Sequence, residues 1–181
     1  MNCMKNDIKE ILVSEDELQK ICDRLGAQIT EEYKGKNLMA IGLLKGSYIF
    51  MADLLRKIDL QCSIDFMAVS SYGSGTRSSG AVKIVKDLSV NPEGYDLLVI
   101  EDILDSGRTL SYVCEMLKTR KPNSIKICTL LDKPSRRVTD LTADYVGMEV
   151  PDEFVVGYGL DFDEKYRNLP YIGILKEEVY S

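Results

Sequence analysis

The sequence predicts an α/β fold with a mainly parallel, twisted sheet flanked by helices. Three observations favour that class: short, wholly apolar runs such as 38–44 and 97–100, amphipathic helical patterns between those runs, and the absence of an internal repeat or a low-complexity linker. Apolar runs of this kind are typical of strands buried on both faces, and their alternation with helices indicates parallel β-α-β units. The 181 residues suffice for one domain with a full hydrophobic core.

The first expected helix has an identifiable start and end. Ser14 and Glu17 form the S-x-x-E pattern of a capping box. Apolar residues then recur at helical spacing over 18–29, and the helix should stop near Gly35.

The remaining elements follow from apolar runs and helical periodicity. Strands are expected at 38–44, 64–70, 82–85, 97–100 and 125–131, and helices at 48–57 and 109–118. Residues 70–81 are rich in glycine and serine, a composition typical of a mobile loop. The segment after Asp132 is loop-rich, with short strands expected near 145–147, 155 and 171–175.

Composition excludes several kinds of chemistry. The chain contains no histidine, which rules out Ser-His-Asp and Cys-His nucleophile systems and imidazole metal ligands. Acid–base chemistry must therefore use carboxylates, Lys, Tyr or Cys. The net charge of −6 argues against non-specific nucleic-acid binding, although a local site can still bind an anion.

The five cysteines are scattered and never form a C-x-x-C pair, which argues against a disulfide framework or a zinc site. The N-terminus has charges spread through it, and no segment approaches the ~18 uncharged apolar residues of a membrane span. We therefore expect a cytoplasmic protein that binds neither nucleic acid nor a membrane.

The segment 97–110, LLVIEDILDSGRTL, carries the strongest functional pattern. Ligands of parallel α/β sheets bind beyond the carboxyl ends of the strands, and here an apolar strand leads to Glu101 and Asp102, then to Asp105, and then to S-G-R-T before a helix. The glycine, the hydroxyls and the free N–H groups of the helix start suit a phosphate. The two leading carboxylates suit sugar hydroxyls or a magnesium-bound ligand.

Together these two ends predict a ribose 5-phosphate site. The residues alone also allow a plainer interpretation. In that interpretation, Glu101 and Asp102 are solvated acids at the end of a strand, and Asp105 caps the following helix. A Walker-type NTPase is excluded, because no G-x-x-x-x-G-K-[ST] loop occurs, and a dinucleotide G-x-G-x-x-G is absent as well.

The segment 97–110 also resembles the phosphoribosyl pyrophosphate signature of type I phosphoribosyltransferases. LLKGSYIF at 43–50 resembles the pyrophosphate loop of that family, and 70–88 resembles its flexible active-site loop. The segments 130–137 and 151–175 resemble the purine-recognition hood. With all five segments, the chain is similar to the hypoxanthine-guanine phosphoribosyltransferases. The resemblance implies the type I fold with a small C-terminal and N-terminal hood, one domain over 1–181, and a purine-binding hood to which 132–181 contributes.

The resemblance implies an enzyme of purine salvage. Such an enzyme transfers the 5-phosphoribosyl group from phosphoribosyl pyrophosphate to N9 of hypoxanthine or guanine, giving IMP or GMP and pyrophosphate. It also implies Mg²⁺ as cofactor and a homodimer or homotetramer.

At the phosphoribosyl end, the resemblance implies three groups of residues. Asp105 would accept the proton at N7 of the purine, and Asp105, Ser106, Gly107, Arg108 and Thr109 would bind the 5-phosphate. Glu101 and Asp102 would hold the ribose hydroxyls and, with Asp161, lie near the metal. Lys45, Gly46 and Arg167 would bind pyrophosphate, with a non-proline cis peptide before Gly46.

At the base end, Lys133 would donate to O6 of the purine, and Phe154 would stack on the purine ring. The backbone of Val155 would meet the polar edge of the purine, and Asp161 would lie near its 2-position. An ammonium only donates, so it favours 6-oxo over 6-amino bases. The Ser71-Tyr72 pair would belong to the loop that closes over the site. Taken singly, Lys45, Arg167 and Phe154 also fit ordinary surface or core positions, and Arg136 and Arg137 are expected to be structural or interface residues.

Two alternatives remain. One is a phosphoribosyltransferase that acts mainly on xanthine, because the choice between xanthine and guanine depends on contacts at C2. The other is a non-catalytic regulator that senses phosphoribosyl pyrophosphate; the presence of Asp105 opposes it.

Overall fold

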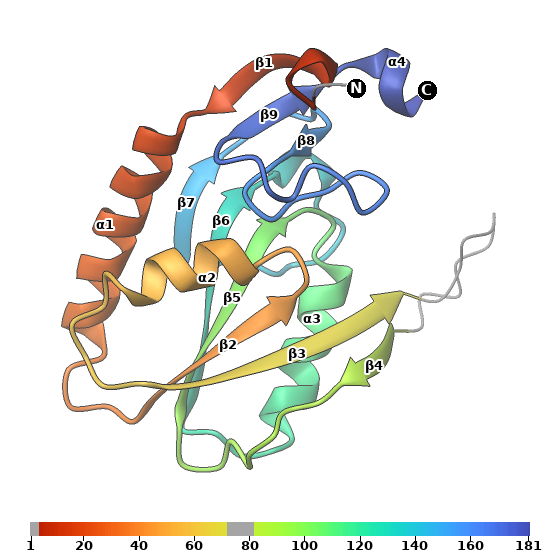
Figure 1. The fold of residues 1–181 in the computed structure, drawn as a ribbon. Coiled ribbons are helices and arrows are strands. Elements are labelled where there is room, and N and C mark those ends of the chain that lie inside the picture. The colour runs from red at the N-terminus through yellow and green to blue at the C-terminus, as the bar shows by residue number, and fades with distance from the viewer. Residues whose placement is uncertain (1–3, 72–81) are drawn as a thin grey trace.

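The computed structural model describes residues 4–71 and 82–181. Within these residues, six strands form a central sheet, and three strands form a smaller sheet at one end of it (Figure 1). In spatial order, the central sheet contains β4 (Val82–Lys86), β3 (Ser63–Ser71), β2 (Leu38–Leu44), β5 (Asp96–Leu104), β6 (Ser124–Asp132) and β7 (Tyr145–Glu149). The smaller sheet contains β1 (Ile8–Val13), β9 (Ile172–Leu175) and β8 (Val155–Val156).

Strand pairing makes the central sheet mainly parallel, which confirms the predicted fold class. β2 pairs in parallel with β3 and β5, and β6 pairs in parallel with β5 and β7, whereas β4 runs antiparallel to β3 at one edge. Helices α1 (Glu15–Glu32) and α2 (Tyr48–Leu55) cover one face, and α3 (Arg108–Lys118) covers the other (Figure 1). Each face of the sheet therefore has its own apolar core.

The start of α1 matches the pattern in its sequence. The Ser14 hydroxyl accepts a hydrogen bond from the Glu17 backbone N–H at 3.4 Å, and the Ser14 N–H donates to the Glu17 carboxylate at 2.8 Å. This reciprocal pair satisfies two backbone groups that would otherwise lack partners at the helix start. The apolar stripe behind it is buried against the sheet, so capping and packing favour the same helix.

Strand β5 is longer than its apolar run predicts. We expected the strand to end at residue 100, but backbone pairing with β6 continues through Ile103 and Leu104. Backbone hydrogen bonds do not require apolar side chains, so the ladder persists where the sheet leaves the core. Glu101 and Asp102 consequently lie within the strand and not in the loop after it.

Strand β1 was not predicted. Its sequence mixes charged and apolar residues, and only Val13 in it is fully buried. It pairs antiparallel with β9, more than 150 residues further along the chain. This pairing creates the smaller sheet from N-terminal and C-terminal segments, as the expected hood requires.

Shorter elements complete the fold. They are two 3-10 helices at Met4–Asp7 and Pro134–Arg136, and helix α4 at Glu177–Tyr180. Within the described residues, Cys22, Cys62, Cys114 and Cys128 are free thiols. In that same part of the chain, no helix combines the length and apolarity needed to cross a membrane.

Replacing Ser14 with alanine is expected to lower the free energy of unfolding by about 1 kcal/mol, because the cap of α1 is lost. Urea unfolding at neutral pH measures this change. Ser111→Ala, inside α3, is the matched control, since the Ser111 hydroxyl makes no hydrogen bond within the described residues. An equal loss in both variants would contradict the capping role.

The same cap predicts a pH dependence. Its hydrogen bonds to Ser14 lower the pKa of Glu17 below the ordinary value of 4.5. A carboxyl with a lowered folded-state pKa stabilises the fold above the ordinary value, and this contribution disappears as pH falls through the lowered one. The difference between wild type and Ser14→Ala should therefore shrink in acid.

Candidate active site

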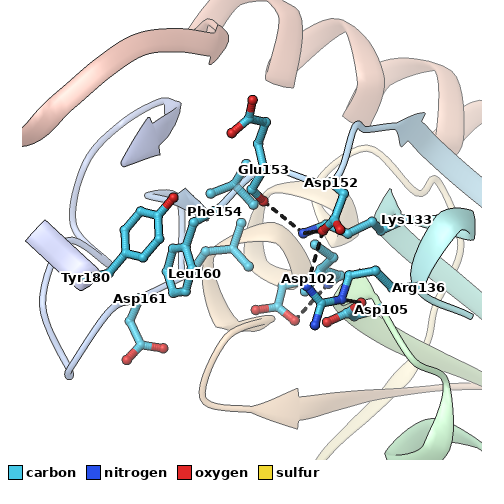
Figure 2. A pocket seen from close by; sticks show the side chains of 12 residues that line it. Asp102, Asp105, Lys133, Arg136, Asp152, Glu153, Phe154, Leu160, Asp161 and Tyr180 are labelled. Carbon is cyan, nitrogen blue, oxygen red and sulfur yellow. Dashed lines mark hydrogen bonds and ion pairs between the residues drawn. The ribbon is translucent and has the colours of Figure 1, made fainter. Parts of the chain in front are cut away.

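A cavity of about 480 Å³ lies where the carboxyl end of β5 meets the smaller sheet (Figure 2). Its lining comes from β5 and the residues after it, from the segments after β6 and β7, from β8 and the segment after it, and from α4. The lining residues are Asp102, Ile103, Asp105, Lys133, Arg136, Asp152, Glu153, Phe154, Val155, Leu160, Asp161 and Tyr180. A second hollow of about 90 Å³ shares Ile103 and Asp105 with it and opens at the start of α3. The two hollows therefore adjoin at Ile103 and Asp105.

The smaller hollow has the features of an anion cradle. Ser106, Gly107 and Thr109 line it, and α3 begins at Arg108, so the N–H groups of the first helical turn lie beside it. One of them, the Arg108 N–H, donates to the Ser106 hydroxyl at 3.5 Å. Gly107 is the N-cap residue with φ +81°, a conformation that favours glycine, and a Cβ there would collide with Thr139. The Arg108 side chain is exposed and lines neither hollow.

Arg137, which we expected to be structural, holds this turn in place. Its guanidinium donates to the carbonyl oxygens of Asp105 at 2.9 Å, Leu104 at 3.0 Å and Leu141 at 2.6 Å, and it forms an ion pair with Asp132. Only 13% of its side chain is exposed. One arginine therefore ties the end of β5 to the end of β6.

Asp105 lies at the junction of the two hollows. Gly107, and not Asp105, occupies the N-cap position of α3, so the plainer interpretation of Asp105 as a helix cap is wrong. Its Oδ1 atom is buried without a hydrogen-bond donor within the described residues, although Arg136 Nε forms an ion pair with it at 3.3 Å. Arg136 also binds Asp152 at 3.2 Å (Figure 2).

Glu101 and Asp102 are neighbours in a strand, so their side chains point to opposite faces of the sheet. Asp102 lines the main cavity and Glu101 the smaller hollow. Burial raises the pKa of Glu101 well above its ordinary value, and the negative charge of Asp102 adds to that effect.

The segment after β2 approaches Asp102 closely. A Cβ at Gly46 would collide with the Asp102 carboxylate, and a Cβ at Gly159 would collide with the Gly46 carbonyl. The Lys45-Gly46 backbone is thus enclosed between β5 and the segment after β8. The non-proline cis peptide joins Leu44 to Lys45, one peptide earlier than expected.

Two of the residues expected to bind pyrophosphate, Lys45 and Arg167, contact the same carboxylate, that of Glu164. Lys45 Nζ lies 2.9 Å from Glu164 Oε2, and Arg167 Nη2 lies 3.5 Å from the same oxygen. Arg167 also forms an ion pair with Asp161 at 2.9 Å and donates to the Gly159 carbonyl at 2.7 Å. Glu164 therefore lies between the two cations, where an anionic ligand would also be favoured.

Lys133 is buried, with 6% of its surface exposed, and its ammonium reaches the main cavity. The Nζ atom donates to the Glu153 carbonyl at 2.8 Å and lies 3.7 Å from Asp152 Oδ1 (Figure 2). An ammonium has three donor hydrogens. A ligand acceptor in the cavity can therefore bind it without displacing the Glu153 contact.

Aromatic and backbone groups form the opposite side of the cavity. Phe154 exposes 37% of its surface, which is unlike a core phenylalanine, and Val155 is buried in β8, where it pairs with Ile174 of β9. Sequence analysis missed six lining residues: Ile103, Arg136, Asp152, Glu153, Leu160 and Tyr180. Their proximity arises from tertiary structure, and no local pattern marks them.

Two expected features, the closing loop and the metal, stay predictions. Tyr72 lies outside the described residues, and so does the side chain of Ser71. Within the described part of the chain, no three His, Cys, Asp or Glu side chains form a cluster that could hold a metal. Single carboxylates, such as Asp102 and Asp161, still fit a Mg²⁺ ion that shares its coordination with substrate phosphates.

Known proteins resemble this chain along its length. The model of the phosphoribosyl transferase domain family matches residues 10–163. The chain is 59% identical over 178 residues to the hypoxanthine-guanine phosphoribosyltransferase of Staphylococcus aureus strain Mu50, covering 98% of this chain and 99% of the relative. It is 60% identical, over 98% of its own length, to the bifunctional protein TilS/HprT of Listeria monocytogenes strain EGD-e, but it spans only 28% of that protein.

Structural comparison agrees with the sequence matches. The crystal structure of a hypoxanthine phosphoribosyltransferase from Staphylococcus aureus, in its tetragonal form, superposes with a TM-score of 0.96 at 59% identity. The match covers 100% of this chain and 99% of that one. The arrangement of both sheets is therefore shared.

Replacing Arg137 with methionine is expected to lower the free energy of unfolding by about 3 kcal/mol, because it leaves the largely buried Asp132 carboxylate and the carbonyls of Asp105 and Leu141 without their donor. Urea unfolding tests this. Arg136→Met is the matched control: the Arg136 side chain is 54% exposed, so its ion pairs contribute about 1 kcal/mol or less. Similar losses in the two variants would show that Arg137 does not anchor the turn.

Proposed function

This chain belongs to the phosphoribosyltransferase family, among the hypoxanthine-guanine phosphoribosyltransferases, and from that premise we propose that it is an enzyme of purine salvage. It transfers the 5-phosphoribosyl group from phosphoribosyl pyrophosphate to N9 of hypoxanthine or guanine. The observation that carries the proposal is the order of groups along one site: an anion cradle at the start of α3, then the Asp105 carboxylate, then the buried Lys133 ammonium.

The phosphoribosyl end occupies the smaller hollow. The 5-phosphate binds the first-turn N–H groups of α3 and the hydroxyls of Ser106 and Thr109. Gly107 lets the chain make the turn beside the cradle, since a side chain there would collide with Thr139. Asp102, and Glu101 from the other face of β5, accept hydrogen bonds from the ribose hydroxyls.

The pyrophosphate end lies between Lys45, the Gly46 backbone and Arg167. Glu164 holds both cations in the absence of ligand and gives way when pyrophosphate oxygens replace its carboxylate. Mg²⁺, when bound through pyrophosphate oxygens and the carboxylates of Asp102 and Asp161, would stabilise the charge of the leaving group.

The base lies in the main cavity. Lys133 donates to the 6-oxo oxygen while it keeps its bond to the Glu153 carbonyl. A 6-amino group has no acceptor for that ammonium, so adenine is disfavoured. The Phe154 ring stacks on the purine, Val155 meets its polar edge, and Asp161 lies towards its 2-position.

Asp105 removes the proton from N7 as N9 bonds to the sugar carbon. The bond from that carbon to the pyrophosphate oxygen breaks in the same step, and the proton passes to the Asp105 carboxylate. The position of Asp105 at the junction of the two hollows suits this role, because the bond between N9 and the sugar carbon forms at that junction. Arg136 stays paired with Asp152 after Asp105 loses its charge.

The wider organisation follows the family. We propose that 1–181 work as one domain, with 132–181 supplying most of the base-binding surface. A homodimer or homotetramer and a cytoplasmic location belong to the same proposal; the four free thiols of the described residues suit a reducing compartment.

A product assay with phosphoribosyl pyrophosphate, Mg²⁺ and hypoxanthine, guanine, xanthine or adenine in turn tests the proposal. Formation of IMP or GMP supports it. If neither hypoxanthine nor guanine yields a nucleotide, the proposal is overturned. Turnover of xanthine alone would favour the xanthine enzyme, and binding of phosphoribosyl pyrophosphate without turnover would favour the sensor.

Replacing Asp105 with asparagine is expected to lower kcat about 100-fold or more, because an amide cannot accept the N7 proton. Steady-state assays of IMP formation measure this loss. Asp140→Asn, at an exposed aspartate outside both hollows, is the control and should leave kcat unchanged. An unchanged kcat in a folded Asp105→Asn enzyme would remove the proposed role.

Replacing Lys133 with alanine is expected to raise KM for hypoxanthine about 10-fold or more, because a charge-assisted hydrogen bond is lost in a buried site. The KM for phosphoribosyl pyrophosphate should change much less. Lys118→Ala, on the exposed side of α3, is the matched control. Equal increases in both KM values would refute the assignment of Lys133 to the base.

A further inference from the structure

We propose that Tyr180, in helix α4, is a positioning residue for base recognition: it supports the Phe154 ring from the side opposite the purine and holds that ring ready for stacking. The inference rests on the proposed function, because it takes Phe154 as the stacking residue. It adds a role for α4, which the motifs of the site do not include.

Three rings form an aromatic cluster at the edge of the cavity, consisting of Phe154, Phe162 and Tyr180. Phe154 and Tyr180 are stacked, with ring centroids 4.9 Å apart and planes at 23°. Phe162 meets Phe154 edge-on at 5.5 Å and 90°, and it meets Tyr180 at 6.5 Å and 67°. These are the arrangements that aromatic rings prefer, so the cluster favours one orientation of Phe154.

The cluster leaves one face of Phe154 free. Figure 2 shows Tyr180 on one side of the Phe154 ring and the Lys133 ammonium on the other. A flat base that binds Lys133 through its oxygen therefore meets the face of Phe154 that Tyr180 does not cover. The order across the site is Tyr180, Phe154, base.

Phe154 needs such support because its backbone does little to fix its side chain. The residue precedes the two-residue strand β8, and its carbonyl accepts a hydrogen bond from the Leu175 N–H at 2.8 Å. That bond fixes the backbone but leaves the ring, which is 37% exposed, free to change rotamer if its neighbours are removed. A ring that is already ordered loses less conformational entropy when the base binds.

Helix α4 is itself attached to the smaller sheet. The Lys176 N–H donates to the Asp7 carbonyl at 3.0 Å, which joins the start of α4 to the segment before β1. Val179 and Tyr180 pack against a buried apolar group that includes Val156 and Leu175. Tyr180 is therefore held by the same sheet that carries Phe154.

The role depends on the ring and not on the hydroxyl. Within the described residues, the Tyr180 hydroxyl makes no hydrogen bond. A phenylalanine at this position should therefore act as well as tyrosine, whereas a side chain without a flat face should not.

The test compares Tyr180→Ala, Tyr180→Leu and Tyr180→Phe with wild type in steady-state assays of IMP formation. Leucine retains apolar packing against the smaller sheet, so it separates loss of stacking from loss of folding. Tyr112→Ala, at an exposed tyrosine of α3 outside both hollows, is the matched control.

The Ala and Leu variants are expected to raise KM for hypoxanthine about 3- to 10-fold. Their KM for phosphoribosyl pyrophosphate and their kcat should stay within about 2-fold of wild type, because the phosphoribosyl end does not involve Tyr180. Tyr180→Phe and Tyr112→Ala should match wild type.

Three results would overturn the inference: an unchanged hypoxanthine KM in Tyr180→Leu, equal increases in both KM values, or a Tyr180→Phe enzyme as impaired as Tyr180→Ala. If wild type itself forms no nucleotide, the proposed function fails and this inference fails with it. If wild type is active and the Tyr180 variants are normal, the inference on Tyr180 fails alone.

Discussion

The backbone pairing between β5 and β6, which continues past the apolar part of β5, is the constraint on which the site depends. The ladder runs to Leu104 paired with Asp132. It therefore carries Asp102 to the edge of the cavity on a rigid strand and brings Asp105 and Lys133, which follow the two strand ends, close together. Arg137 then closes this junction by binding the carbonyls of Leu104 and Asp105. Because the anchor uses backbone carbonyls, it fixes the turn whatever ligand lies above it.

Charge is arranged so that every cation of the site already has an acidic partner. The ion pairs are Lys45–Glu164, Arg167–Asp161, Arg136–Asp105, Arg136–Asp152 and Lys133–Asp152. A chain with net charge −6 can therefore bind an anionic substrate by exchange: substrate oxygens replace protein carboxylates. Because the chain has no histidine, the proposed proton transfer also uses a carboxylate, and Asp105 has the position for it. Burial raises the pKa of Glu101, which disfavours its charged form.

Local signals in the sequence predicted the central sheet and the segment 97–110, whereas the candidate residues outside that segment came from the family resemblance. Apolar runs identified β2, β5 and β6, and the S-x-x-E pattern identified the start of α1. Strand β1 was not predicted because charged and apolar residues are mixed in its sequence and its partner β9 lies far along the chain. Tyr180 and Glu164 were not predicted for a similar reason. Each acts through a tertiary contact, and neither a tyrosine nor a glutamate carries a sign in the sequence of what it will contact.

The two ends of the site are held by different parts of the fold, and this has a consequence for specificity. The anion cradle lies on the central sheet, between the end of β5 and α3, where both apolar cores support it. Phe154, Val155 and Tyr180 lie on the smaller sheet and on α4, whose attachment depends on the β1–β9 pairing and on a few contacts such as Lys176 with Asp7. Changes on the smaller sheet can therefore alter which base is accepted while the cradle keeps its geometry. Changes at Arg137 or along β5–β6 would instead affect the binding of every substrate, because both hollows meet at Asp105.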